Sequence, residues 1–494
     1  MAVRKNYLLQ ALLKANYFPM QKKRKEEMPP IFTSSDLTKD IAVEIINAPL
    51  SEDRKKIGGF DSVQYKTTRY NNVPRLLSIP HPKSYIDLCM GIYNNWTKIK
   101  HICTNGNSLI LPKVHSDGRI IIMDYENSLE ERNRYNKSVF GNKFLVHTDI
   151  ANFYPSLYSH SIPWALVGIA EAKRMQFAAN YWFNKIDKLI RSCCRNETAG
   201  ILIGPATSNI VSEIILERID RDLREKYNYV RFIDDYTAYF KTHTKAEKFI
   251  RDLTVELMKY KLNLNIKKTE IKDLPQAINE EWVGKIREII PRNSVIDSSQ
   301  VSNILDAAVI LQRGNPDGSI LKYAANSIVG KVDENSSVEF VKYVIRLCYH
   351  HPILIPTLSK PLNTVYNNEL EEFKEELLFL LNDSIINMRS DAVCWLLYYL
   401  KIFHNDIPTE MGEKIIEYGD CVPLTLLAEF PTHQSEVVGF TNQLNKTDLY
   451  ELDAYWLLLY QLYLKRKIRN PYKQDATFKI LRTQGVSFVG LNAN

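Results

Sequence analysis

Three aspartates stand at the ends of two apolar stretches that have the composition of β-strands. The first stretch, residues 144–149 (FLVHTD), ends at Asp149, and the second, residues 230–235 (VRFIDD), ends at Asp234 and Asp235. A carboxylate at the end of a buried strand is costly to desolvate unless a positive group faces it. Three such acids from two strands therefore predict a divalent cation site with the hard oxygen ligands that Mg²⁺ prefers. Two such ions can clamp the attacking and leaving oxygens of a phosphoryl transfer, so the expected chemistry is nucleotidyl transfer.

The elements that must position these acids have a mixed α and β pattern. Apolar periodicity predicts a strand, two helices, a strand pair and a further helix in this part of the chain. The expected elements after the Asp149 strand are helices over 164–190 and 208–227, strands over 229–234 and 236–241, a helix over 245–261 and a short edge hairpin over 263–272. Upstream, residues 109–114 and 119–123 flank His-Ser-Asp-Gly and predict a β-hairpin.

The remainder of the chain divides into a basic N-terminal segment and a helical C-terminal part. Tyr7–Tyr17 is expected to form an amphipathic helix, and a basic run follows it. With 494 residues the chain is too long for one core, so two or three domains are expected. From about residue 296 strand signals nearly vanish, and helices are predicted over Val301–Leu311, Ser337–Tyr349, Asn367–Leu381, Asp391–Phe403, Pro423–Glu429 and Thr447–Arg469. Helices of this length with short loops favour a stacked HEAT-like array, although no fixed period is evident.

The charge distribution favours a polyanionic partner for the N-terminal part. The net charge is +7, but residues 1–300 carry 46 Lys+Arg against 34 Asp+Glu, whereas residues 301–494 carry 18 against 23. The basic part thus contains the acidic motifs, which nucleic-acid phosphates would explain. A solvated lysine-rich surface is the alternative. No apolar run is long enough to span a bilayer and no CxxC spacing occurs among the seven cysteines, so we expect a cytoplasmic protein with reduced thiols and no membrane partner.

Five motifs, in order, resemble those of reverse transcriptases. Asp149–Tyr154 (DIANFY) resembles the first catalytic motif, and Phe232–Asp235 (FIDD) resembles the YxDD box with Phe in the tyrosine place. The others are Gly200–Asn209 (GILIGPATSN), similar to the Gly-rich motif under the nucleotide and template; Arg75–Pro82 (RLLSIPHP), similar to the fingers motif; and Leu264–Thr269 (LNIKKT), similar to the lysine-bearing turn after the palm helices.

The resemblance implies a role for each motif residue. Asp149 and Asp234 would ligate two Mg²⁺ ions, for which Mn²⁺ could substitute, with the Ile150 carbonyl completing one shell and Asp235 beside them. Arg75 would grip the triphosphate of a dNTP bidentately, Tyr154 would lie beneath the sugar and select deoxynucleotides, and Gly204 would contact the nucleotide. Lys268 would protonate the pyrophosphate leaving group. The alternatives are a solvated Asp-Asp turn, a core aromatic at Tyr154 and a surface salt bridge at Arg75.

The sequence of residues 149–166 and 200–216 is similar to that of the abortive-infection (Abi) polymerases. These are the AbiK-like and prophage-encoded members of the bacterial "unknown group" reverse transcriptases. Most templated reverse transcriptases carry Gln immediately before the central glycine of the Gly-rich motif, where it supports the template–nucleotide pair. Here Ile203 precedes Gly204, and an apolar side chain cannot make those polar contacts. This departure fits the Abi family, which extends DNA without a template from a tyrosine of its own chain. The resemblance also implies a homo-oligomer, a trimer or hexamer, and a single-stranded DNA product attached covalently to the protein; which of the 28 tyrosines primes is open.

The expected fold is therefore an α+β right-hand polymerase followed by an all-α, HEAT-like domain in place of the thumb. Its expected divisions are an N-terminal helix and basic segment (1–30), fingers (31–145), a palm (146–290) and the helical domain (291–494). Two other readings stay open: a conventional RNA-templated reverse transcriptase of retron or intron type, and a non-catalytic nucleic-acid-binding defence scaffold. A palm-fold nucleotide cyclase is a smaller rival, because the motifs at Arg75 and Gly204 have no role in it.

Overall fold

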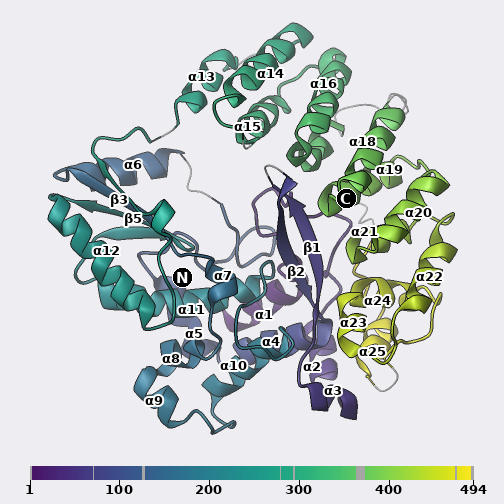
Figure 1. The fold of residues 1–494 in the computed structure, drawn as a ribbon, viewed down its shortest axis with the longest axis horizontal. Helices are drawn as coiled ribbons and strands as arrows, with labels where there is room; N and C mark the ends of the chain where they lie inside the picture. Colours follow the sequence, from purple (N-terminus) through teal and green to yellow (C-terminus); the bar gives the residue numbers. More distant parts are fainter. Residues whose placement is uncertain are drawn as a thin grey trace.

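The chain folds into a mixed α/β part and a helical arc that returns to it. The computed structural model describes residues 3–69, 72–124, 128–278, 280–292, 295–316, 318–362, 373–472 and 475–490. The helices of the C-terminal part run along the top and right of Figure 1, and the mixed part lies at the left and centre. The arc closes on the mixed part because Thr33 N donates to Phe488 O over 3.1 Å and Gly490 N donates to Ile31 O over 3.0 Å.

A four-stranded antiparallel sheet carries both acidic stretches. Its strands are β3 (Phe144–Asp149), β4 (Tyr229–Phe232), β5 (Asp235–Phe240) and β6 (Glu270–Asp273), in the order β4-β5-β3-β6. The register places Asp149 opposite Asp235. Only Ile233 and Asp234 separate β4 from β5, and Ile233 has a φ of +57°, the left-handed conformation that a two-residue hairpin turn requires. The predicted strand pair is thus confirmed, and its turn holds an acid.

Two long helices pack near this sheet. They are α11 (Ala206–Leu223) and α12 (His243–Met258), which contact each other, and α12 also contacts β3 and β5. Thr242 starts α12, because its hydroxyl accepts from the Lys245 amide. Phe249 on α12 is fully buried and packs against the rings of Tyr227 and Tyr229. The helices predicted over 208–227 and 245–261 are confirmed, with ends shifted by a few residues.

Short helices and one further hairpin complete the mixed part. The hairpin pairs β1 (Ser62–Thr68) with β2 (Pro74–Pro80) along their whole length. The helices are α1 (Lys5–Lys14), α2 (Lys39–Asn47), α3 (Glu52–Ile57), α4 (Pro82–Asn94), α5 (Trp96–Ile99), η2 (Lys100–Thr104), α6 (Ser128–Val139), α7 (Phe153–Ser156), α8 (Ser161–Val167), α9 (Ile169–Arg174) and α10 (Trp182–Ser192). The helix expected over Tyr7–Tyr17 is therefore present as α1, displaced toward the N-terminus.

After β6 the described residues form helices and no further strand. The elements are α13 (Glu281–Ile289), α14 (Ser298–Gln312), α15 (Ser319–Ile328), η4 (Glu334–Ser336), α16 (Ser337–His350), η5 (Pro352–Leu358), α17 (Ser359–Leu362), α18 (Lys374–Ile386), α19 (Ser390–Ile402), α20 (Thr409–Tyr418), α21 (Cys421–Leu427), α22 (Gln434–Gln443), α23 (Leu449–Ala454), α24 (Trp456–Leu464) and α25 (Thr477–Thr483). Their lengths range from 3 to 15 residues, so the helical character is confirmed while the HEAT-like repeat stays a prediction. The start of the helix expected over Asn367–Leu381 lies outside the described residues.

The expected hairpin over residues 109–123 was wrong. Two hydrogen bonds, from Lys113 N to Ile120 O and from His115 N to Arg119 O, hold a turn, but no strands form. The upstream segment instead joins the edge of the palm sheet, since Leu109 N donates to Arg231 O over 2.8 Å. Residue 109 thus pairs with β4, which is distant in the sequence, and not with the neighbouring segment 119–123.

Two helices that were expected to be unbroken are divided, and a third expected element, a hairpin, does not form. The helix over 164–190 is divided at Gly168, whose φ of +88° ends α8, and it is irregular again between α9 and α10. The helix over 447–469 is divided at Tyr455. The segment 263–272 is not a hairpin, because Leu264 pairs with Ile150 and a 3₁₀ turn separates it from β6. The predicted domain boundaries stay predictions.

Across the described ranges, no helix is long and apolar enough to cross a membrane.

Candidate active site

The three acids meet where β3 ends and the β4–β5 turn begins. Asp149 lies opposite Asp235, and the Ile150 amide donates to the Asp234 carbonyl over 3.3 Å. The segment between α12 and η3, residues 263–265, closes the other side, because Asn265 N donates to the Asp149 carbonyl over 2.7 Å. The backbone thus fixes all three acids from both flanks, as their sequence positions led us to expect.

The acids share an environment that penalises their charges. Burial raises the pKa of Asp234 to about 7, and the neighbouring Asp149 and Asp235 carboxylates add to the rise. Burial and then Asp149 raise the pKa of Asp235 as well. Asp149 is only 6% exposed, and its Oδ1 atom is buried without a hydrogen-bond partner. The site therefore has unneutralised negative charge and a free acceptor atom.

Lys268 supplies a positive charge at this site. It ends the 3₁₀ turn η3 (Ile266–Lys268), and its Nζ forms an ion pair with Asp149 Oδ2. The hydrogen bond to Asp149 raises the pKa of the Lys268 ammonium. The lysine that the sequence singled out therefore lies on the acids themselves, and one ammonium faces three carboxylates.

The donor set at this site fits Mg²⁺. As the side chains stand, no cluster of three or more acidic, His or Cys groups within the described residues is arranged to hold a metal ion. Lys268 is paired with the Asp149 carboxylate in this arrangement. The carboxylates, the Ile150 carbonyl and the unpartnered Asp149 Oδ1 are nevertheless hard oxygen ligands with surplus negative charge. Their assignment as metal ligands stays a prediction.

A buried ion network anchors the turn that carries Asp234. Arg231 is fully buried, and its guanidinium binds Glu213 at 2.7 and 3.1 Å and Asp220 at 3.1 and 2.7 Å. The same group donates to the Ile233 carbonyl over 2.6 Å, within the turn itself. Both acids lie on α11, so this helix sets the conformation of the acidic turn. We did not identify this network from the sequence.

Tyr154 lies between the acids and the Gly-rich segment. It is half-buried on α7, and Asn209 Nδ2 donates to its hydroxyl over 3.2 Å. Burial raises the pKa of the Tyr154 hydroxyl, Asp234 adds to the rise, and Arg75 opposes it. Both the acid and the arginine are therefore close to this ring. Asn209 ends the Gly-rich motif, and this position was the only sequence signal for its contact with Tyr154.

Gly204 is required by close packing. Its φ is +138°, and a Cβ at this position would meet Pro19 Cβ at 2.8 Å and the Ser78 carbonyl at 3.0 Å. Gln21 donates to the Gly204 carbonyl over 3.0 Å, and Ser78 N donates to the Ile203 carbonyl over 2.7 Å. The N-terminal segment and β2 thus hold the Gly-rich motif from two sides. The role of Gly204 in nucleotide binding stays a prediction.

Arg75 is exposed at the start of β2, where it pairs with Thr67 of β1. A second arginine of the same hairpin, Arg69, is near it, because burial and then the Arg75 cation lower the pKa of Arg69. Among the residues whose placement is described, no salt bridge joins either arginine to a carboxylate. The two guanidinium groups therefore form an unpaired cationic site, which suits a polyphosphate. Arg69 was missed because only its neighbours in space, not its position in a motif, identify it.

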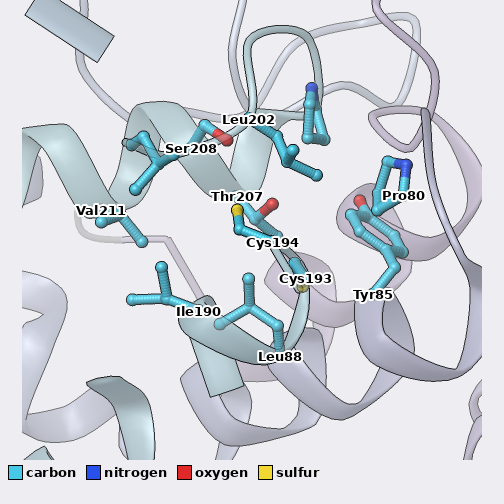
Figure 2. Close-up of a pocket in the computed structure, with 12 residues that line it drawn as sticks. Pro80, Tyr85, Leu88, Ile190, Cys193, Cys194, Leu202, Thr207, Ser208 and Val211 are labelled. Carbon is cyan, nitrogen blue, oxygen red and sulfur yellow. The ribbon is translucent and has the colours of Figure 1, made fainter. Parts of the chain in front are cut away.

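A small apolar gap lies behind the Gly-rich motif, between α4, α10 and the start of α11. Figure 2 shows the side chains of Tyr85, Leu88, Cys193, Cys194 and Val211 around it. Burial raises the pKa of Cys194 to about 12 and that of Cys193 well above its ordinary value, so both remain thiols. This gap is a packing feature that supports the motif.

Three acids at one end of an antiparallel sheet, with Arg75 close to the Tyr154 ring beside them, are the arrangement expected of a nucleotidyltransferase of the polymerase palm type, and the assignment of this site stays a prediction. Residues 114–287 match the family model described as reverse transcriptase (RNA-dependent DNA polymerase), so the chain contains a reverse-transcriptase domain. Among solved structures, the apo telomerase from Candida tropicalis is similar at 11% identity, with 80% of this chain and 70% of that chain covered and a TM-score of 0.33. A likeness at this level carries no argument about function. A search of curated proteins gave no match.

Proposed function

We propose that this protein is a bacterial, cytoplasmic antiphage polymerase of the abortive-infection type that joins dNTPs without a template, starting from a tyrosine of its own chain. The reverse-transcriptase domain supports the polymerase chemistry. The acids that converge with surplus negative charge support the use of Mg²⁺, with Mn²⁺ as a substitute. The resemblance of the motifs to Abi polymerases supports the defence role and a trimeric or hexameric assembly.

The environment of Gly204 carries the proposal that no template is read. Ile203 stands where most templated enzymes have a glutamine, and a glutamine that does contact Gly204, Gln21, is only 1% exposed. Its amide nitrogen donates to the Phe18 and Gly204 carbonyls, and its oxygen accepts from Asn16 Nδ2 over 2.6 Å. Both N–H donors of Gln21 are therefore used, and its side chain is buried away from a template–nucleotide pair. An apolar Ile203 cannot supply a donor or acceptor either.

The proposed reaction uses each site residue in one step. Asp149, Asp234 and the Ile150 carbonyl would hold the ions, with Asp235 adjacent, and the ions when bound neutralise charge on the attacking and leaving oxygens. Arg75 and Arg69 would bind the triphosphate oxygens, and Tyr154 would exclude a 2′-hydroxyl from the sugar site. Lys268, already on Asp149, would give a proton to the departing pyrophosphate.

The priming tyrosine must reach the acids, which excludes buried rings. Ten tyrosines are buried, namely Tyr17, Tyr65, Tyr85, Tyr229, Tyr236, Tyr239, Tyr260, Tyr399, Tyr460 and Tyr472. Of the others that are described, Tyr181 and Tyr349 are exposed by 37% and 44%. Tyr70, Tyr125 and Tyr366 lie outside the described residues. The choice among the accessible tyrosines is left to the mapping of the linkage.

Incubation of the purified protein with labelled dNTPs and Mg²⁺, without template or primer, tests the proposal. We expect label that migrates with the polypeptide and that resists boiling in detergent, because the first nucleotide is bonded to a side chain. A parallel reaction with a primed RNA template tests the templated alternative, which the family match favours. Copying of that template with no label on the polypeptide would contradict the untemplated proposal.

A different experiment distinguishes the proposed polymerase from a non-catalytic defence scaffold. Cells that carry the Asp149→Asn/Asp234→Asn variant should lose phage protection if polymerisation is the function. Protection that survives loss of both acids would assign the function to binding alone.

A further inference from the structure

The β1–β2 hairpin, which carries Arg69 and Arg75, is fastened to the C-terminal helices. β1 packs against α19, α21, α23 and α24. Figure 1 shows the hairpin beside α19 and α21, with its far end turned toward the helices at the top. A hairpin of two strands is marginally stable by itself, so its position depends on what it packs against.

Asp391 holds the tip of this hairpin. It lies in the first turn of α19, is only 7% exposed, and accepts from Thr68 N over 2.7 Å and from Thr68 Oγ1 over 2.5 Å. Thr68 is the last residue of β1, adjacent to Thr67, which is the register partner of Arg75. The Arg389 side chain adds a bond to Asn72 in the same tip, 2.9 Å from Nε to Oδ1. The start of α19 therefore binds both ends of the hairpin's turn, at Thr68 and at Asn72.

The base of the hairpin is held just as firmly. Arg54 and Asp453, both almost fully buried, form a two-bond ion pair at 2.7 Å each, and the Asp61 amide donates to the same carboxylate over 3.0 Å. The Trp456 indole donates to the Ile79 carbonyl over 3.1 Å. The hairpin is thus fixed to the helical region at both of its ends.

The other side of the hairpin faces the active site, because Ser78 of β2 bonds the Ile203 carbonyl in the Gly-rich motif. We propose that the helical region fixes the nucleotide-binding hairpin, and that Asp391 is the positioning residue that holds Arg75 at the triphosphate. Asp391 touches no substrate in this proposal; it acts through Thr68. The proposal rests on the proposed function, in which Arg75 binds the triphosphate.

Steady-state kinetics of the full-length Asp391→Asn variant test the proposal. The Asp391 carboxylate accepts from two backbone amides, those of Thr68 and Ala392, one on each oxygen. An asparagine keeps the shape but has one NH₂ group in place of an oxygen, so whichever way it turns one of these bonds becomes a clash of two donors and the grip on Thr68 weakens. We expect KM for dNTP to rise about tenfold, which corresponds to about 1.4 kcal/mol of lost ground-state binding, with kcat changed by less than about twofold. Thr68→Val, which removes only the hydroxyl bond, should raise KM by a smaller factor. Because both changes act on the contact between Asp391 and Thr68, the double variant should raise KM by less than the product of the two single effects.

Asp333→Asn is the matched control. Asp333 caps η4 in the same helical region by accepting from Ser336 N over 2.7 Å, so its loss weakens a helix start without a bond to the hairpin. We expect KM to stay at the wild-type value. Hydrogen exchange gives a readout without catalysis: the Thr68 amide should exchange faster in Asp391→Asn and at the wild-type rate in the control.

The outcomes separate this proposal from the proposed function. Absence of dNTP incorporation by the wild-type protein would overturn the proposed function. If Arg75→Ala raises KM while Asp391→Asn and Thr68→Val leave KM unchanged, Arg75 binds the nucleotide and the positioning role of Asp391 is wrong. An unchanged exchange rate of Thr68 in Asp391→Asn would also overturn it.

Discussion

Asp149→Asn and Asp234→Asn each reduce nucleotide incorporation by at least about 1,000-fold, because each change removes a charge from a site that must stabilise several kcal/mol of developing phosphate charge. The substitutions keep the shape of the side chains, so the fold is retained. Single-turnover incorporation of labelled dNTP at saturating Mg²⁺ measures the effect.

The effect of Mg²⁺ on Tm gives a second test of the roles of Asp149 and Asp234. Burial, and then repulsion among the acids, raises the pKa of Asp234 and Asp235. The proposed Mg²⁺ ions would relieve this repulsion, so their addition should raise the Tm of the wild-type protein. The Mg²⁺-dependent rise should disappear in both variants. Asp273→Asn, on β6 beside Phe144 at the opposite end of the sheet, should keep activity and the Mg²⁺ response. Activity within tenfold of wild type in Asp149→Asn would show that this acid is not a metal ligand.

Arg231→Met lowers the free energy of unfolding by about 3–5 kcal/mol, because Glu213 and Asp220 then remain buried without a cation. Urea denaturation measures the loss. Arg218→Met is the matched control on the neighbouring surface, where Arg218 pairs loosely with Asp222 at 3.9 Å, and should change stability by less than about 0.5 kcal/mol.

A compensated variant distinguishes charge from packing at this site. Arg231→Met combined with Glu213→Gln and Asp220→Asn removes both uncompensated carboxylates and should recover part of the lost stability. Its activity should stay low, since the bond from Arg231 to the Ile233 carbonyl is still missing from the acidic turn. Wild-type stability of Arg231→Met alone would contradict the role given to this network.

Local patterns were sufficient to locate the acids. Asp149 and the Asp234–Asp235 pair end apolar runs in the sequence. The structure has Asp149 at the end of β3 and the pair at the turn from β4 to β5, and these strands form because much of their length is buried. Tyr154, Arg75 and Lys268 were found through motif order, and the structure places Tyr154 and Lys268 next to the acids. The helical nature of the C-terminal part was equally visible, because its periodicity is strong.

Contacts between segments distant in the sequence could not be predicted from local patterns or motif order. Arg231, Glu213 and Asp220 have the spacing of ordinary surface charges on an amphipathic helix and a strand, and only the fold shows that they are buried. The bond between Gln21 and Gly204 joins residues 183 positions apart, and that between Thr68 and Asp391 spans 323. Such pairs leave no periodic signal in a single sequence. The attachment of the hairpin to the helical region therefore came from the structure alone.

The most direct test of protein-primed, untemplated synthesis is the intact mass of the protein purified from cells. We expect a ladder above the polypeptide mass whose steps equal deoxynucleotide residues, and a single unmodified mass for Asp149→Asn. Fragment masses of the digested ladder would then identify the priming tyrosine. A single unmodified mass for the wild-type protein, unchanged after incubation with dNTPs and Mg²⁺, would contradict the account.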